Sequence, residues 1–295
     1  MSTSATTSAD GSAGSAFFAA YDAALARWPV PAEALDVRTE HGTTRVNACG
    51  PRDGRPLVLL HGGGATSAAW LACVGALAAA GHRVLAVDLI GDPGRSVLDG
   101  SPLGSVAGLL GWLDAVLDGL GVRTADLCGH SYGAWIALEY ALHAPARVGR
   151  LALLDPTQCF AGFRPGYLLR VLPLLLLPRT TARARSYLDW ESRGSGLDAG
   201  LREVYALGHA GFPASRPVTG PRPTPARLRE LAAPTLVLVA ELSRPHDARR
   251  LADSARAALP AATVTVLPGV SHHTLPTAHP AELNRHLTEF LTTHG

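Results

Sequence analysis

Apolar stretches alternate with amphipathic ones along residues 56–154, and this pattern constrains the fold of the 295-residue chain most. It predicts strands at 56–60, 83–88, 123–128 and 148–154, with helices at 67–80, 104–119 and 132–143. Two short strands, 36–40 and 44–48, precede this stretch, and a helix is expected at 16–28. Such alternation favours a mostly parallel sheet with helices on both faces, which is an α/β fold.

The alternation stops after residue 156 and resumes with a strand at 234–240. The chain between them is rich in Pro, Leu and Arg, with helical patches and no clear strand. Helices at 247–258 and 280–292 then flank a strand at 263–267. We therefore predict a core of residues 16–156 and 231–295 interrupted by a helical cap, 157–230. The Ser-, Thr-, Ala- and Gly-rich residues 1–15 predict a disordered tail.

The pentapeptide Gly129-His130-Ser131-Tyr132-Gly133 lies between a predicted strand and a predicted helix. It fits the Gly-x-Ser-x-Gly nucleophile elbow, whose context is a strand, a sharp turn and a helix. The serine of such a turn has a strained backbone, and side chains at the flanking positions would collide with the strand and helix. The alternative is an ordinary βα turn with an incidental serine.

Two further motifs follow predicted strands in the expected order. His61-Gly62-Gly63-Gly64 ends the strand at 56–60, and Pro268-Gly269-Val270-Ser271-His272 follows the strand at 263–267. With the elbow, these motifs resemble the α/β-hydrolase fold family, whose triad runs Ser, acid, His along the chain. The resemblance covers roughly residues 36–293, and it includes the segment at 88–96 and Trp70.

The resemblance implies roles for four residues. Ser131 would be the nucleophile and His272 its base, with the neighbouring His273 as the rival. The backbone N–H groups of Gly63 and Tyr132 would stabilise the oxyanion.

The acid is where the chain departs from the family pattern. Relatives carry an aspartate shortly after the strand that corresponds to 235–240, and Ser243 occupies that place here. Asp155, at the end of the preceding strand, is our preferred acid, because some haloalkane dehalogenases place theirs similarly. Asp247 and Glu241 are the alternatives, although Asp247 also fits the N-cap of the next helix.

Composition excludes several classes of protein. The net charge of +2 argues against a nucleic-acid partner. All 26 basic residues are Arg, so chemistry that needs a lysine Schiff base, including pyridoxal phosphate attachment, is excluded. The four cysteines lack metal-type or redox-type spacing, and residues 1–15 do not read as a secretory signal. We expect a cytoplasmic protein without cofactor, metal or membrane span; the oligomeric state stays open.

These features predict a serine hydrolase that cleaves a small to medium, largely apolar ester or lactone through an acyl-enzyme. Ser131 argues against dehalogenase and epoxide hydrolase chemistry, which use an aspartate at the elbow. The alternatives are a lyase or cofactor-independent oxygenase on the same fold, or a degenerate ligand-binding member. The predicted cap contains arginines at residues 164, 170, 179, 183, 185 and 193. They form either a solvated helical face or, in one case, a partner for a substrate carboxylate.

Overall fold

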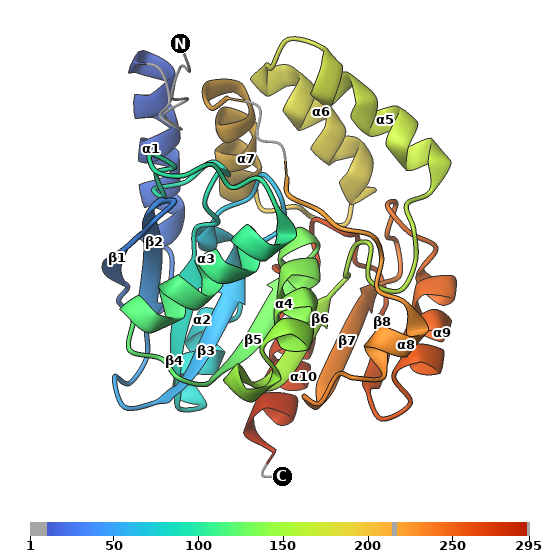
Figure 1. Ribbon diagram of the computed structural model, residues 1–295. Coiled ribbons are helices and arrows are strands. Elements are labelled where there is room, and N and C mark those ends of the chain that lie inside the picture. The colour runs from blue at the N-terminus through green and yellow to red at the C-terminus, as the bar shows by residue number, and fades with distance from the viewer. Residues whose placement is uncertain (1–10, 214–216, 294–295) are drawn as a thin grey trace.

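The computed structural model describes residues 11–213 and 217–293, which form a single eight-stranded sheet with helices around it (Figure 1). The strand order is β1-β2-β4-β3-β5-β6-β7-β8. The strands are β1 (Glu33–Thr39), β2 (Gly42–Cys49), β3 (Arg55–Leu60), β4 (His82–Val87), β5 (Ala125–His130), β6 (Val148–Leu154), β7 (Thr235–Ala240) and β8 (Thr263–Leu267). Strand β2 runs antiparallel to both neighbours, whereas every other neighbouring pair is parallel. The predicted α/β fold with a mostly parallel sheet is confirmed.

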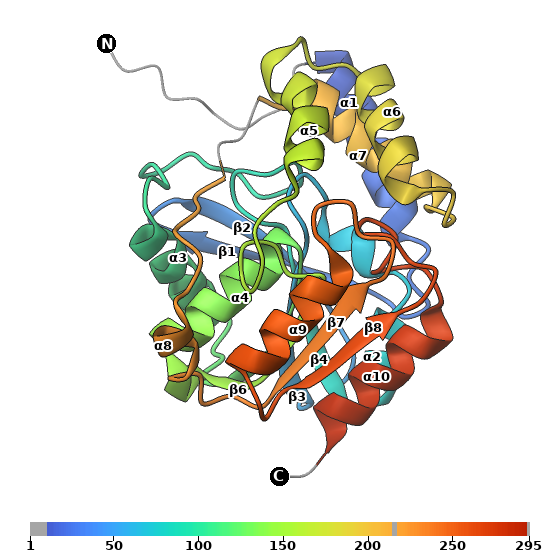
Figure 2. The same ribbon diagram turned by 90° about the vertical axis from the view of Figure 1, so that its right-hand side faces the viewer.

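Helices bury their apolar stripes on both faces of the sheet. One face is covered by α3 (Val106–Gly119), α4 (Tyr132–His143) and α9 (Ala248–Ala258). The other is covered by α2 (Val74–Ala79) and α10 (Pro280–Thr292), which lie next to each other in Figure 2. In α10 the leucines at 283, 287 and 291 recur every fourth residue and are all buried, as expected for a helix with one apolar face.

Helices also occupy the chain between β6 and β7. They are α5 (Pro165–Leu176), α6 (Thr181–Ser192), α7 (Ala199–Gly211) and the short α8 (Pro225–Leu228). Helices α5, α6 and α7 lie beyond the carboxyl ends of the parallel strands (Figures 1 and 2). Open α/β sheets bind their ligands at that edge. In the described part of the chain, no helix combines the length and apolarity needed to cross a membrane.

The helix α1 (Gly11–Leu25) differs from the prediction at its start. Residues 11–15 belong to its first turns, so the predicted tail 1–15 is wrong there, and residues 1–10 lie outside the described chain. Phe17 and Tyr21 are fully buried, and the Phe17 ring meets Phe212 edge-on at 4.7 Å between centroids. This packing beside α7 supplies stability that a short, Ala-rich helix lacks alone.

The predicted helix at 67–80 is also divided. A 3-10 turn at Ser67–Trp70 precedes α2, with a break between them. The Ser67 N–H donates to Asp88 Oδ1 at 2.9 Å, and Trp70 is buried in the core. These tertiary contacts hold the first segment in its own orientation.

Candidate active site

Ser131 occupies a sharp turn between β5 and α4. Its backbone has φ 55° and ψ −113°, a positive-φ conformation that is strained for a serine. A Cβ added at Gly129 would lie 2.3 Å from the Gly133 oxygen, and one at Gly133 would lie 2.0 Å from the Leu60 oxygen. Both flanking positions therefore require glycine.

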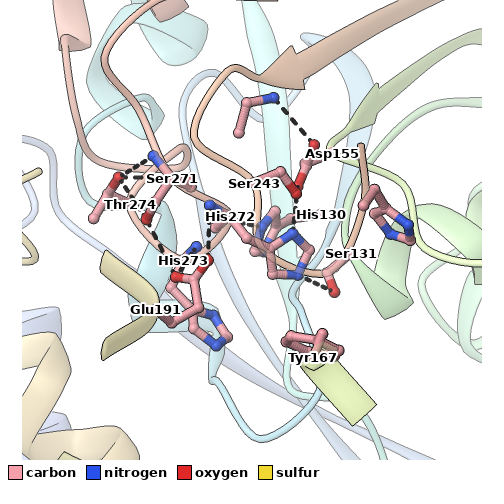
Figure 3. A network of polar contacts seen from close by, with 12 residues as sticks. His130, Ser131, Asp155, Tyr167, Glu191, Ser243, Ser271, His272, His273 and Thr274 are labelled. Atoms are coloured by element: carbon pink, nitrogen blue, oxygen red, sulfur yellow. Dashed lines mark hydrogen bonds and ion pairs between the residues drawn. The ribbon is translucent and has the colours of Figure 1, made fainter. Parts of the chain in front are cut away.

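Ser131, His272 and Asp155 form a continuous chain of hydrogen bonds, with each ring nitrogen of His272 facing one partner (Figure 3). Nε2 of His272 lies 2.8 Å from Ser131 Oγ, and Nδ1 lies 2.5 Å from Asp155 Oδ2. The three residues come from β5–α4, the end of β6 and the segment after β8. All three are buried, with Ser131 the most exposed at 9%.

The partners determine where the protons lie. An ionised Asp155 only accepts hydrogen bonds, so Nδ1 of His272 carries a hydrogen. In the neutral ring Nε2 is then an acceptor, and the hydroxyl of Ser131 donates to it. This tautomer is the one in which the imidazole can remove the serine proton.

Asp155 and His272 shift each other's pKa. Burial alone would raise the pKa of Asp155, but the hydrogen bond and charge of His272 outweigh it and lower the pKa to about 2. Burial alone would lower the pKa of His272, but the hydrogen bond from its ring to Asp155 and the charge of that carboxylate raise it. The pair therefore favours an ionised carboxylate and a basic imidazole.

The other candidate acids lie in different surroundings. The Asp247 side chain accepts from the Arg250 N–H at 3.0 Å and caps α9, whereas Glu241 accepts from the Gly269 N–H at 2.9 Å. Ser243, in the family's usual position for the acid, donates to Asp155 Oδ2 at 2.7 Å. Asp155 also accepts from the Ala240 N–H at 3.0 Å, so it is held from β7 and from the loop after it.

Three other histidines support the site in different ways. His273 lies 3.1 Å from the Tyr187 hydroxyl, and its pKa is well below the usual value because of burial and the nearby His272. Nε2 of His130 donates to the His272 carbonyl at 2.8 Å, and burial lowers the pKa of His130 to about 3. His61 accepts from the Leu89 N–H at 3.0 Å, which supports the glycine-rich turn.

The two expected oxyanion donors flank the serine. A Cβ on Gly63 would lie 3.8 Å from that of Tyr132, so the glycine-rich turn faces the start of α4. Gly63, Tyr132, Ser131 and His272 line one cavity of about 440 Å³. A carbonyl group bound there would lie among a hydroxyl, an imidazole and two backbone segments.

Three residues of this network were not assigned a role from the sequence. Ser243 carried a signal, because it stands where the family acid is expected. His130 was visible only as the variable residue of the elbow. Glu191, which contacts the His272 segment, is one of several acidic residues in the insertion, and no sequence pattern distinguishes it.

Metal and cofactor sites were not predicted. In the ranges 11–213 and 217–293, no three His, Cys, Asp or Glu side chains gather in a way that could hold a metal ion. The four cysteines are buried as free thiols. Burial raises the pKa of Cys49 to about 11, which makes a reactive thiolate unfavourable there.

Comparison with known sequences identifies similar carboxylesterases. The chain is 37% identical over 175 residues to carboxylesterase YbfK of Bacillus subtilis (strain 168) and 30% identical over 174 residues to the uncharacterized carboxylesterase nap of the same organism. Each alignment covers 59% of this chain. The alignments span 57% and 56% of these relatives, respectively.

Solved structures are similar over a longer range. The crystal structure of carboxylesterase CesB (YbfK) from Bacillus subtilis matches with a TM-score of 0.87 at 27% identity, over 96% of this chain and 99% of that one. Naproxen esterase from Bacillus subtilis matches with a TM-score of 0.86 at 25% identity, with the same coverage. The model of the alpha/beta hydrolase family matches residues 57–286, a range that contains Ser131, Asp155 and His272. Sequence, sheet topology and family model agree, and the chain belongs to the alpha/beta hydrolase family.

Proposed function

We propose that this protein is a serine carboxylesterase in which Ser131, His272 and Asp155 form the catalytic triad. The observation that carries the proposal is the hydrogen-bonded chain of these residues, 2.8 Å and 2.5 Å long at its two links, beside a cavity of about 440 Å³. Similarity to two carboxylesterases of Bacillus subtilis supports the same reaction.

The reaction follows from the position of each proton. His272 Nε2 removes the hydroxyl proton as Ser131 Oγ attacks the ester carbonyl, and the N–H groups of Gly63 and Tyr132 stabilise the oxyanion. His272 then gives that proton to the leaving alcohol as the C–O bond breaks. A water attacks the acyl-enzyme with His272 again acting as the base, which releases the acid and restores Ser131.

The cavity beside Ser131 favours an apolar ester of moderate size. Its walls are largely aromatic and aliphatic, and they include Trp135, Phe163, Tyr167, Val171 and Leu174. Three of these belong to α5, so the insertion supplies much of the lining. We accordingly propose that residues 157–230 are a cap over a core of residues 16–156 and 231–295.

A fluorophosphonate probe combined with p-nitrophenyl esters tests this function. We expect the probe to label Ser131, and both Ser131→Ala and His272→Ala to abolish turnover of the esters. Intact, folded protein that is neither labelled nor active would refute the assignment.

Two alternatives to ester hydrolysis are a lyase or oxygenase and a degenerate ligand-binding protein. Ser243 in place of the usual acid leaves lyase or oxygenase chemistry open, but Asp155 contacts His272 in its place. A ligand-binding member would not need an intact triad, whereas here all three side chains are within hydrogen-bonding distance of their partners. Neither alternative is favoured by a specific observation.

A further inference from the structure

Glu191 is a fully buried carboxylate in the last turn of α6, and it contacts the backbone that carries His272 (Figure 3). Its Oε1 accepts from the His272 N–H at 3.2 Å. Its Oε2 accepts from the His273 N–H at 3.0 Å and from the Ser271 hydroxyl at 3.2 Å. One side chain of the insertion thus satisfies three donors on consecutive residues.

This position is unfavourable for α6 itself. The carboxyl end of a helix carries partial negative charge, so a carboxylate in the last turn destabilises the helix. Burying a carboxylate is also unfavourable unless hydrogen bonds or charges compensate it. The compensation for Glu191 comes from hydrogen bonds, which are donated by the three groups near His272. The hydrogen bonds to the His272 segment therefore account for a carboxylate at position 191, which α6 alone would disfavour.

Ser195 provides a second contact between the insertion and the same segment. Its hydroxyl lies 3.0 Å from Thr274 Oγ1, which accepts from the Ser271 N–H at 2.9 Å. The turn from Ser271 to Thr274 is thereby bonded at both ends to the region around the end of α6.

We propose that Glu191 is a positioning residue, which fixes the backbone of His272 and brings a carboxylate close enough to act on its imidazole. This inference rests on the proposed function, because it concerns the base of the same triad. The charge acts in the same direction as that of Asp155: both raise the pKa of His272. Burial raises the pKa of Glu191, while the charge of His272 opposes that rise.

Several titratable groups surround His272 and Glu191, and their ionisation also affects an NMR titration of His272. Asp155 and Glu191 are the carboxylates that face His272, and three imidazoles lie near it, those of His130, His246 and His273. Burial lowers the pKa of each of these three rings, which favours their neutral forms. Glu191 is also close enough to interact with Arg244, Tyr167, Tyr187 and Tyr205.

Three variants test the proposal. Glu191→Gln keeps the size but removes the charge and turns an NH2 group toward a backbone donor. Glu191→Asp keeps the charge but shortens the reach. Glu203→Gln is the matched control, because Glu203 is a carboxylate of α7 that pairs with Arg185 at 2.7 Å and does not touch the His272 segment.

We expect E191Q to lower kcat roughly 10- to 100-fold with little change in KM, since a displacement of about 1 Å has that effect on a catalytic group. The pKa of His272, followed by NMR, should fall in E191Q and remain near the wild-type value in E191D, which should still lose kcat. E203Q should match the wild type in both measurements. Wild-type kcat and wild-type titration of His272 in folded E191Q would overturn the proposal.

The two readouts separate this proposal from the esterase assignment. A wild-type protein without ester turnover or fluorophosphonate labelling would refute the esterase, whereas the NMR titration of His272 needs no substrate. If E191Q does not fold, E191D carries the test, and wild-type kcat in E191D would overturn the positioning role.

Discussion

Ser243 donates a hydrogen bond of 2.7 Å to Asp155, although Ser243 stands where the family usually carries the acid itself. Asp155, the acid that we propose, lies at the end of β6, and the residue at the family's usual acid position, on the loop after β7, hydrogen-bonds to it. The Ala240 N–H, also from β7, adds a second bond to the same carboxylate. Both arrangements bring a carboxylate to Nδ1 of the histidine, since β6 and β7 are neighbours in the sheet.

Replacement of Asp155 by Asn should reduce kcat by about 10⁴-fold, because the amide favours the wrong tautomer of His272. Asp247→Asn and Glu241→Gln are the matched controls, since neither side chain touches His272. Steady-state kinetics on a p-nitrophenyl ester measures the effect. A larger loss in either control than in D155N would assign the acid elsewhere.

Ser243→Ala should lower kcat about tenfold, because a hydrogen bond to a charged group contributes about 1.5–3 kcal/mol. The variant leaves Asp155 with its bonds to His272 and the Ala240 N–H, so the triad persists. The pKa of Asp155 should rise, since the Ser243 hydroxyl helps to lower it. Unchanged kinetics in S243A would mean that the bond does not contribute to orienting the acid.

The rate should fall as the pH decreases through the pKa of His272. Catalysis needs the neutral imidazole, and Asp155 raises the pKa of His272 above its ordinary value of 6.5, so the acidic limb of kcat/KM is expected above pH 6.5. The folded state binds this proton more tightly than the unfolded state, so the protonated ring stabilises the fold at low pH and that contribution is lost as the pH rises through the folded-state pKa. A pH profile of kcat/KM with a limb below 6.5 would contradict this expectation.

Arg179, in the insertion, lines the cavity beside Ser131 that we propose binds the substrate. Its Nε donates to the His209 carbonyl at 2.6 Å, and burial lowers its pKa. We expect Arg179→Ala to raise KM roughly tenfold for an ester that carries a carboxylate, with a smaller change for a neutral ester of equal size.

Arg185→Ala is the control for this experiment, because Arg185 pairs with Glu203 away from the serine. It should leave both KM values unchanged. Equal effects of R179A on the charged and the neutral ester would indicate a packing role for Arg179, without recognition of a substrate carboxylate.

The sequence by itself determined the sheet, the serine elbow and the order of the motifs. These are local properties: strands and helices follow from the periodicity of apolar residues, and the glycines at 129 and 133 are required by backbone contacts within one turn. The sequence also narrowed the candidate base to two adjacent residues, His272 and His273. It did not show which ring nitrogen of that histidine faces the serine and which faces the acid.

Only the tertiary structure decided which carboxylates contact His272. Asp155 and His272 are 117 residues apart, and Glu191 is 81 residues from His272, so no local pattern relates them. Their contacts depend on the pairing of β6 with β7 and on the packing of α6 over the segment after β8. Such distances are set by the summed packing of the whole core, which sequence periodicity does not encode.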